Sequence, residues 1–263
     1  MQRYIKAGKT IKVMNVIIRQ ARKEEASQIA ELFMLAWPVD EILESNGLTC
    51  EQLHESITLV AANEETIYSY ENTLVAEIDG KVVGAMCAYD GADYQRLKQP
   101  IVDALGPDCG FAKMKETEAG EFYLDSVGVL LEYRGRGIAS RIIEAQCERA
   151  ASHGHKVAGL IVDIDKPQVE ALYSRLGFTH LDDKDFFGHT MKHMIRLLDM
   201  TDKYYRHFKG NVYRVLHIAK PRRDGRISGH VRRTWRMGKT QVYVRRSDRE
   251  GRKGLQTVLT NFC

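Results

Sequence analysis

A glycine turn between an apolar run and a helical run constrains this chain more than any other feature. The turn reads Arg134-Gly135-Arg136-Gly137-Ile138-Ala139 and directly follows the strand-like run 121–129. Its two glycines let the backbone approach a ligand without a Cβ in the way. The N–H groups and the dipole at the start of a helix attract anions, and two arginines add positive charge. The turn predicts a pyrophosphate site, although a Gly-x-Gly turn alone also occurs in ordinary loops.

The residues after the turn continue the alternation of strands and helices. Residues 156–163 read as a second apolar strand, and residues 167–176 read as a short helix. Val169, Leu172, Tyr173 and Leu176 recur in that helix at helical spacing. Gly177-Phe178 then ends the helix and begins a further strand.

These segments resemble the acyl-CoA-binding core of the GNAT superfamily of N-acetyltransferases. Arg134-x-x-Gly137-x-Ala139 matches the family's (Gln/Arg)-x-x-Gly-x-(Gly/Ala) loop, and Leu172-Tyr173-x-x-x-Gly177-Phe178 matches its second signature. The chain departs from the family at Leu131, where Pro is common, and at Asp165-Lys166, where Asp-Asn is common. The resemblance implies an α/β (α+β) fold with a mixed, mostly antiparallel central sheet flanked by helices.

The resemblance also implies the reaction and the cofactor site. Members move an acetyl group from acetyl-CoA to a primary amine, of a small molecule or a protein, through a ternary complex. Their fourth and fifth strands splay apart, and the pantetheine arm lies in the gap. This places the backbone of Val127, Gly128 and Val129 against the cofactor amides, and the loop 134–139 against the pyrophosphate. Gly128 suits a bulge in the strand.

The chemistry requires a proton acceptor for the amine, because an alkyl ammonium titrates near ~10.4. Period-two alternation predicts one strand face with the side chains of Glu121, Tyr123, Asp125, Val127 and Val129. Family members that use a carboxylate base carry it at or near this point, which favours Asp125, acting through a water, over Glu121. The alternative is that Asp125 hydrogen-bonds neighbouring backbone.

The proton donor for the leaving thiolate is expected to be Tyr173. In the family, the tyrosine of this helix points its hydroxyl at the cofactor sulfur, and a phenol remains a donor up to about pH 10. The alternative is an aromatic core residue. His189 and His193 are expected to be structural or exposed, because their spacing is not that of metal ligands.

The first 120 residues fit the same fold. A strand is expected at 13–21, a helix at 23–35 that Trp37-Pro38 breaks, and a helix from Thr49 to about residue 63, capped with Gln52. The runs 73–78 and 81–89 form a hairpin around Asp79-Gly80. Residues 91–120 are less regular: 94–105 could be helical despite Pro100, and 113–118 look solvated. By resemblance this insertion shapes an acceptor pocket, and a plain surface loop is the alternative.

Charge divides the chain of 263 residues. Residues 201–263 hold five Lys and twelve Arg against four acids, or +13, whereas residues 1–200 hold 22 bases against 31 acids, or −9. We therefore expect an N-terminal extension (1–13), an acetyltransferase domain (14–200) and a basic C-terminal segment (201–263) that is β-rich or partly disordered. The start of that segment, at about residue 205, resembles a small bacterial domain of unknown function.

The basic segment leaves a second function open. Tyr213, Trp235 and Tyr243 lie among its arginines, so it could bind RNA or DNA by phosphate contacts and stacking. Alternatively it is a solvated tail that folds back on the acidic body. A third reading is a sensor that binds acyl-CoA without transferring it. The acidic body itself hints at a cationic acceptor such as a polyamine, an aminoglycoside or a lysine side chain.

Composition limits the remaining classes. No run approaches the roughly 20 apolar residues of a membrane span, and no signal peptide opens the chain, so a cytoplasmic protein is expected, with a homodimer possible. The five cysteines are scattered and unpaired in sequence, which predicts neither a disulfide framework nor a metal site. They are Cys50, Cys87, Cys109, Cys147 and Cys263.

Overall fold

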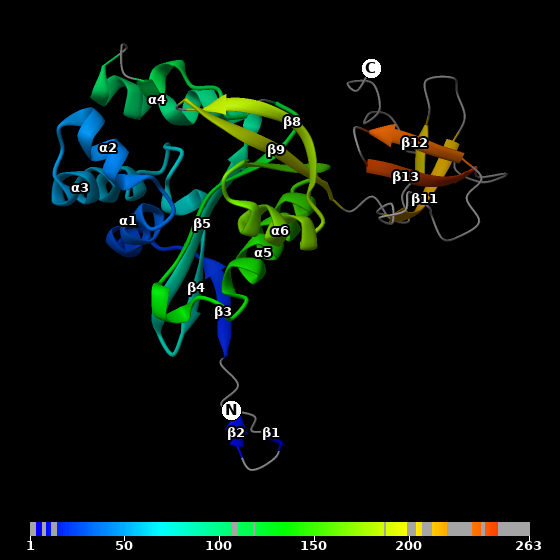
Figure 1. Cartoon of the computed structure of the whole chain (residues 1–263), viewed down its shortest axis with the longest axis horizontal. Coiled ribbons are helices and arrows are strands. Elements are labelled where there is room, and N and C mark those ends of the chain that lie inside the picture. The colour runs from blue at the N-terminus through cyan, green and yellow to red at the C-terminus, as the bar shows by residue number, and fades with distance from the viewer. Residues whose placement is uncertain are drawn as a thin grey trace. The chain divides into compact units, whose positions relative to one another are not determined.

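The chain divides into two compact units, Met1–Ser152 and His153–Cys263, and Figure 1 labels helices and strands of both. The computed structural model describes residues 4–6, 9–11, 15–106, 110–117, 119–186, 188–198, 204–206, 212–219, 233–237 and 240–246. Seven strands belong to the fold, four in the first unit and three in the second, and their pairings within each unit are antiparallel. Helices flank these strands, which confirms the expected fold class.

The sheet of the first unit runs in the order β3-β4-β5-β6, and all three pairings are antiparallel. Its strands are β3 (Val16–Gln20), β4 (Thr73–Ile78), β5 (Lys81–Asp90) and β6 (Phe122–Val129). Asp79 and Gly80 join β4 to β5 with φ values of 49° and 83°. A two-residue turn with two left-handed residues matches the twist of a hairpin, as Asp-Gly predicts. The strands β1 (Tyr4–Lys6) and β2 (Lys9–Ile11) form a separate hairpin.

Helices pack on both faces of these strands. One face carries α1 (Ala26–Met34), whose Ile29, Leu32 and Phe33 are buried, with α2 (Val39–Asn46) and α3 (Cys50–Ala61) around it. The opposite face carries α5 (Ile138–Ser152), whose Ile138 and Ile142 lie against Gly84 of β5. The short helices are η1 (Lys23–Glu25), η2 (Tyr70–Asn72), η3 (Gly91–Asp93), η4 (Gly110–Lys113) and η5 (Leu131–Tyr133).

Local signals set several boundaries. The Thr49 hydroxyl accepts from the backbone N–H of Gln52, and the Gln52 side chain accepts from the N–H of Thr49. This reciprocal cap begins α3, as expected. The helix α2 was not anticipated, because Trp37-Pro38 read only as a break. Pro38 instead stands at the cap position of α2, before the first helical residue, where its missing N–H costs nothing.

The described residues of the insertion 91–120 include a helix and buried polar side chains. The helix α4 (Tyr94–Leu105) runs through Pro100, and its Lys98 is only 3% exposed. The Lys98 ammonium donates to the carbonyls of Ala112 and Met114, at 3.1 and 2.7 Å. The expectation that the acids and lysines of 113–118 are solvated holds at Lys113 and Lys115 and was wrong at Glu116, which is buried. Tertiary hydrogen bonds, such as that from the Tyr123 hydroxyl to Glu116 (3.1 Å), compensate the polar side chains.

The strand β6 contains a bulge that changes which residues share a face. Leu124 pairs with Ala88 and Val127 pairs with Met86, so that two residues, Asp125 and Ser126, oppose the single residue Cys87. The predicted alternation through residue 129 is therefore wrong beyond Asp125. Beyond the bulge, Gly128 faces α1, because a Cβ there would lie 1.8 Å from the carbonyl oxygen of Leu32.

Val129 lies on the other face of β6. It pairs with Gly84, whose own Cβ position meets Ile138 and Ile142 of α5. Directly paired residues of antiparallel strands share a face. The bulge that was expected at Gly128 thus lies at Asp125–Ser126, and Gly128 is required by close helix packing instead.

Up to residue 198, the described part of the second unit contains the strands β7, β9 and β8, paired in that order, and the helix α6. Its elements are β7 (Val157–Asp163), α6 (Pro167–Arg175), β8 (Thr179–Phe186) and β9 (His189–Leu197). Pro167 opens α6 at its first position, where proline is favoured. No helix in the described part of the chain is long and apolar enough to span a bilayer.

The C-terminal backbone forms a four-stranded antiparallel sheet in the order β10-β11-β13-β12. These strands are β10 (Tyr204–Arg206), β11 (Val212–Ala219), β12 (Arg233–Met237) and β13 (Thr240–Arg246). The β-rich character expected for this segment is therefore seen in its backbone. The domain boundaries after residues 13 and 200 stay predictions.

Candidate active site

The glycine turn has the geometry that an anion site requires. The chain leaves β6, passes through η5 and reaches α5 with φ values of 73° at Gly135 and 77° at Gly137. Both values lie in the left-handed region that glycine adopts at little cost. Ile138, Ala139 and Ser140 begin α5, and the first N–H groups of a helix have no carbonyl partner within it.

The surroundings of the turn fit a phosphate group. Both glycines are exposed, and a Cβ at either position would meet no atom of the described chain within 4 Å. The first turn of α5 carries no acidic residue that would repel an anion. The residues of the turn thus leave room for a pyrophosphate and provide N–H groups beside it.

The two arginines of the turn also hold the turn together. Arg134 donates through Nε to the carbonyl of Val129, at 3.0 Å. Arg136 donates to the carbonyl of Glu132, at 2.8 Å, and its guanidinium lies 5.4 Å from the Tyr133 ring centre. Both arginines were expected to supply charge for a phosphate, and in the structure both also hold the loop by hydrogen bonds to its backbone.

The favoured base, Asp125, is held by hydrogen bonds from two hydroxyl groups. The Tyr89 hydroxyl donates to Oδ2 and the Ser126 hydroxyl donates to Oδ1, each at 2.8 Å. The Trp37 indole N–H in turn donates to Ser126 Oγ, at 2.7 Å. Burial raises the pKa of Asp125, and the bonds from Ser126 and Tyr89 oppose that rise.

Aromatic side chains surround this carboxylate. Tyr89 lies between Tyr94 and Tyr123, with ring centres 6.3 and 5.8 Å away. Trp37 and Tyr68 lie 4.9 Å apart. Burial, and after it the nearby charges of Asp125 and Glu116, raise the pKa of Tyr68, Tyr89, Tyr94 and Tyr123, so these hydroxyl groups remain protonated donors.

The second-choice base, Glu121, occupies a different setting. It is 6% exposed, and it accepts a hydrogen bond from the Thr117 hydroxyl, at 2.8 Å. This contact ties the insertion to the strand preceding Asp125. Glu121 is therefore well placed to hold the insertion against the start of β6.

Tyr173 belongs to the second unit and lies on α6. It is 7% exposed and packs edge-on against Phe178, with ring centres 6.0 Å apart. Burial raises the pKa of Tyr173 to about 12. In the same unit, His193 is buried beside Asp182 (2.8 Å), and His189 lies 3.8 Å from Asp163. Among the described residues, no group of three or more His, Cys, Asp or Glu could hold a metal ion.

A pocket of about 810 Å³ lies in the first unit, away from Asp125. It is bounded by η1, α1, the β4–β5 turn and the start of η5, and Asp125 is not among the residues that line it. Its lining is Arg22, Glu24, Glu25, Gln28, Glu31, Leu32, Gly80, Lys81, Val82, Leu130 and Glu132. None of the predicted site residues lines it.

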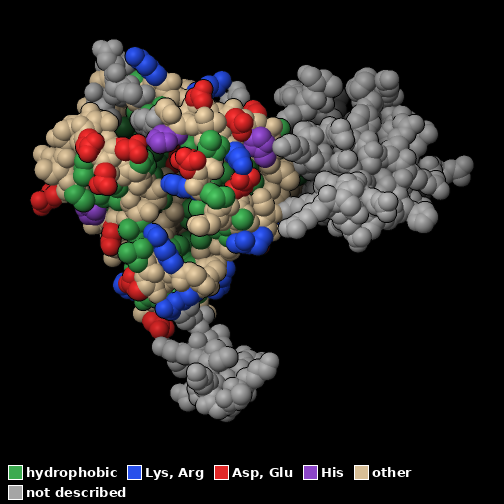
Figure 2. Space-filling view, in the orientation of Figure 1, with side chains coloured by type: hydrophobic (Ala, Val, Ile, Leu, Met, Phe, Trp, Pro, Cys, Tyr) green, Lys and Arg blue, Asp and Glu red, His purple; other side chains and the backbone are tan. Residues whose placement is uncertain are grey.

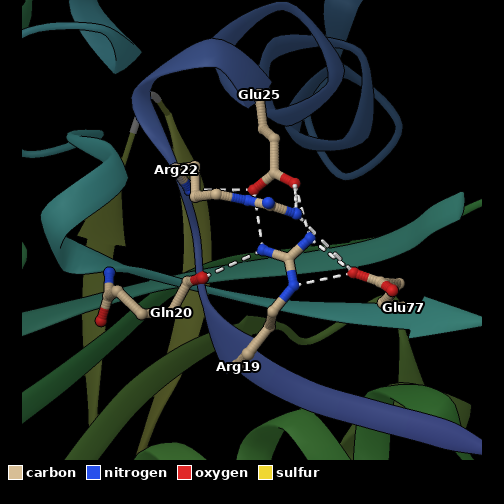
Figure 3. A network of polar contacts seen from close by, with 5 residues as sticks. All are labelled: Arg19, Gln20, Arg22, Glu25 and Glu77. Carbon is tan, nitrogen blue, oxygen red and sulfur yellow. Dashed lines mark hydrogen bonds and ion pairs between the residues drawn. The ribbon is translucent and has the colours of Figure 1, made fainter. Parts of the chain in front are cut away.

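Two pocket residues belong to an ion-pair network that fixes the start of α1 (Figure 3). Arg19 donates to Glu25 at 2.6 and 2.9 Å, to Glu77 at 2.8 Å and to the carbonyl of Gln20 at 3.1 Å. The backbone N–H of Arg22 also donates to Glu25, at 2.8 Å. The hydrogen bonds from Arg19 are the main cause of the lowered pKa of Glu25. The network joins β3, β4 and η1.

The helices α2 and α3 present an acidic surface. No Lys or Arg occurs between residues 26 and 80, a stretch that includes both helices. Figure 2 shows acidic side chains gathered over this part of the molecule. The exposed carboxylates of the two helices are Asp40, Glu41, Glu44, Glu51 and Glu55.

Sequence reasoning missed three residues of this site, namely Trp37, Ser126 and Tyr89. Trp37 read only as part of a helix break, and Ser126 was expected on the face opposite Asp125. The one available signal was the aromatic richness of the segments before and around β6. The contacts themselves depend on the bulge and on packing between distant segments, which a local pattern does not encode.

Comparison with known proteins places the chain in a family. The family model for the acetyltransferase (GNAT) family matches residues 26–178, more than half of the chain. The chain belongs to the GNAT acetyltransferase family. The resemblance seen in the two sequence signatures is thereby confirmed, and acyltransferase activity follows as the general class of reaction.

Solved structures agree with this assignment. A crystal structure of an acetyltransferase is 29% identical, with a TM-score of 0.60, and the match covers 70% of this chain and 100% of that one. An N-acetyltransferase from Staphylococcus aureus Mu50 is 24% identical, with a TM-score of 0.60, over 68% of this chain and 99% of that one, and supports the fold alone. No curated protein matches this sequence.

Proposed function

We propose that this chain is an N-acetyltransferase that moves an acetyl group from acetyl-CoA to a primary amine within a ternary complex. The observation that carries the proposal is the exposed turn at Gly135 and Gly137, which opens α5 with left-handed φ values. The N–H groups of residues 134–139 would hold the pyrophosphate. The backbone of Val127, Gly128 and Val129 would hold the pantetheine amides. Acetyl-CoA supplies a thioester when bound.

Asp125 is the proposed proton acceptor. An alkyl ammonium with a pKa near ~10.4 must lose a proton before it can attack, and Asp125 takes that proton directly or through a water. Because burial raises the pKa of Asp125, the carboxylate is a stronger base than an ordinary exposed aspartate. As the pH is lowered, activity should therefore be lost at a pH above about 3.9, the usual pKa of aspartate.

Tyr173 is the proposed proton donor to the leaving thiolate. With a pKa of about 12, its hydroxyl remains protonated at neutral pH. A buried hydroxyl that keeps its proton can donate to a sulfur atom on which negative charge develops.

The acceptor is proposed to be cationic. The exposed carboxylates of α2 and α3, with no Lys or Arg between residues 26 and 80, would attract a polyamine, an aminoglycoside or a lysine side chain.

The test begins with cofactor binding. Acetyl-CoA should raise the melting temperature of the protein, because a ligand that binds only the folded state stabilises it. Gly137→Glu should abolish that rise, and Gly47→Glu, at a left-handed position outside the turn with φ of 63°, should keep it. Calorimetry that finds no binding of acetyl-CoA or CoA would refute the proposal.

The second stage tests the reaction. With acetyl-CoA and a panel of amines, thiol release should be detected for a cationic acceptor. Asp125→Asn and Tyr173→Phe should each lower turnover about 10²-fold or more while acetyl-CoA affinity stays nearly unchanged. Binding of acetyl-CoA without acetylation of any amine would favour a sensor that does not transfer the acyl group. If Tyr173→Phe lost acetyl-CoA affinity as much as turnover, Tyr173 would have a structural role.

A further inference from the structure

Asp125 and Ser126 are consecutive in a strand, yet their side chains are hydrogen-bonded to each other. In a regular strand, neighbouring side chains point to opposite faces. The bulge opposite Cys87 brings both to the α1 face, where Ser126 Oγ lies 2.8 Å from Asp125 Oδ1. The bulge is thus the backbone feature that gives this carboxylate a hydroxyl partner.

The chemistry of Trp37 fixes the direction of these hydrogen bonds. An indole N–H can only donate, so Ser126 Oγ accepts from Trp37, at 2.7 Å. The single hydrogen of the Ser126 hydroxyl is then directed at Asp125 Oδ1. The Tyr89 hydroxyl donates to Oδ2. Both carboxylate oxygens act as acceptors, an arrangement that suits the ionised form of Asp125.

Among the described residues, the causes that shift the pKa of Asp125 are burial and the hydrogen bonds from Ser126 and Tyr89, and no positive charge is one of them. The titratable groups on which the charge of Asp125 acts are Tyr68, Cys87, Tyr89, Tyr94 and Tyr123, and each has its pKa raised mainly by burial. They are neutral at neutral pH. Glu116 is the second carboxylate acting on the four tyrosines. Hydrogen bonds are therefore what oppose the desolvation of Asp125.

We propose that Trp37 and Ser126 are positioning residues that act through Asp125, keeping its carboxylate oriented and ionised for proton transfer. Trp37 lies between α1 and α2, so the connection between these helices influences the orientation and ionisation of the Asp125 carboxylate. Tyr68 packs on the same indole ring, at 4.9 Å, and holds it in place. This role rests on the proposed function, in which Asp125 is the proton acceptor.

The first experiment measures the ionisation of Asp125 without using activity. The carboxyl carbon of Asp125 is followed by NMR titration of the full chain, with Asp125→Asn used to assign the signal. Ser126→Ala should move the titration midpoint up by about one pH unit, because one hydrogen bond to the charged form is lost. Ser126→Thr retains the hydroxyl and should keep the wild-type midpoint.

The double variant tests whether Trp37 acts through Ser126. Trp37→Phe should move the midpoint in the same direction by a smaller amount. Trp37→Phe combined with Ser126→Ala should give the midpoint of Ser126→Ala alone, because the indole then has no hydroxyl to direct. The proposal that Trp37 acts through Ser126 on Asp125 would be overturned if the single variants kept the wild-type midpoint. It would also be overturned if the shift of the double variant equalled the sum of the two single shifts. Melting curves confirm that the variants compared are folded.

The second experiment measures the rate of acetyl-CoA turnover against pH, with spermidine and a lysine-containing peptide as acceptors. The acid limb of kcat/KM should move by the same amount as the NMR midpoint in Ser126→Ala, whereas a merely structural role would lower the rate at every pH. Full turnover in Asp125→Asn would overturn both the proposed base and this positioning role. If Asp125→Asn is inactive but Ser126→Ala leaves the NMR midpoint unchanged, only the positioning role of Trp37 and Ser126 would be overturned.

Discussion

Gly128 is fixed by the residue that lies opposite it. The carbonyl oxygen of Leu32, in α1, would lie 1.8 Å from a Cβ on Gly128. That oxygen belongs to the backbone of a packed helix, so it cannot rotate away as a side chain would. The glycine lets α1 rest directly on β6, three residues beyond Asp125.

Gly128→Ala should therefore destabilise the protein strongly. We expect a loss of about 1–3 kcal/mol or more in the free energy of unfolding, because the helix must move to admit a methyl group. Denaturant unfolding monitored by circular dichroism measures this loss. Gly47→Ala is the matched control: its φ is 63°, but the space around it is open, so only about 1 kcal/mol of backbone strain is expected. If Gly128→Ala and Gly47→Ala lowered the free energy of unfolding equally, α1 would have to move away from β6 at little cost.

Among the elements, the start of α1 is held by charged groups in addition to its buried apolar residues. The Arg19 guanidinium lies between two carboxylates from different segments, Glu25 and Glu77, with side-chain exposures of 11% and 18%. Such shielded, multiply bonded pairs stabilise more than an exposed pair does. The network connects β3 to the helix that carries Leu32.

Glu25→Gln should lower the free energy of unfolding by about 1–2 kcal/mol at neutral pH. The folded state lowers the pKa of Glu25 below 4.5, so its contribution is present above that value and is lost as the pH falls through the lowered pKa. The difference between Glu25→Gln and wild type should thus shrink below about pH 4. Urea unfolding across this range measures it, with exposed Glu24→Gln as the control. A difference independent of pH would refute the argument.

The sequence predicted those elements whose signals are local. The hairpin at Asp79-Gly80, the capped start of α3, and the turn at Gly135 and Gly137 all follow from residues with strong backbone preferences. The location of the bulge was not predictable, because it depends on how β6 pairs with β5. The environment of Asp125 depends on that bulge, so Asp125 could be proposed as the base from the sequence, but its hydrogen-bond partners could not be predicted.

Burial in the insertion shows the same limit. Glu116 and Lys98 are charged residue types that are almost always exposed unless paired. Their burial depends on hydrogen bonds with carbonyl and hydroxyl groups 7 to 16 residues away in the chain, which come into contact only when the insertion folds.

For the whole molecule, the uneven charge of the chain raises the question of what the basic segment does. Residues 201–263 carry +13 and residues 1–200 carry −9. The backbone of the segment includes a four-stranded sheet, whereas the family match ends at residue 178. We infer that catalysis belongs to the part before residue 200, and that the basic segment adds a separate property.

A chain ending at Met200 should fold and keep its acetyl-CoA affinity. If the arginines of the segment contact phosphates, the full chain should bind RNA or DNA with an affinity that falls steeply with salt, and the shortened chain should not. Fluorescence anisotropy with a labelled oligonucleotide at several salt concentrations measures this. If the shortened chain still bound nucleic acid, binding could not be assigned to the basic segment. If it failed to fold, the proposed domain boundary at residue 200 would be wrong.

The buried ammonium of Lys98 also allows the local opening of the insertion to be measured in solution. Its donation to two carbonyls, at 3.1 and 2.7 Å, keeps it away from solvent while α4 and η4 remain together. An amine-reactive reagent reaches Lys98 only through a transient opening of this contact. The labelling rate of that one lysine, compared with exposed lysines, therefore reports how often α4 separates from the residues 112–114 that follow it within the insertion.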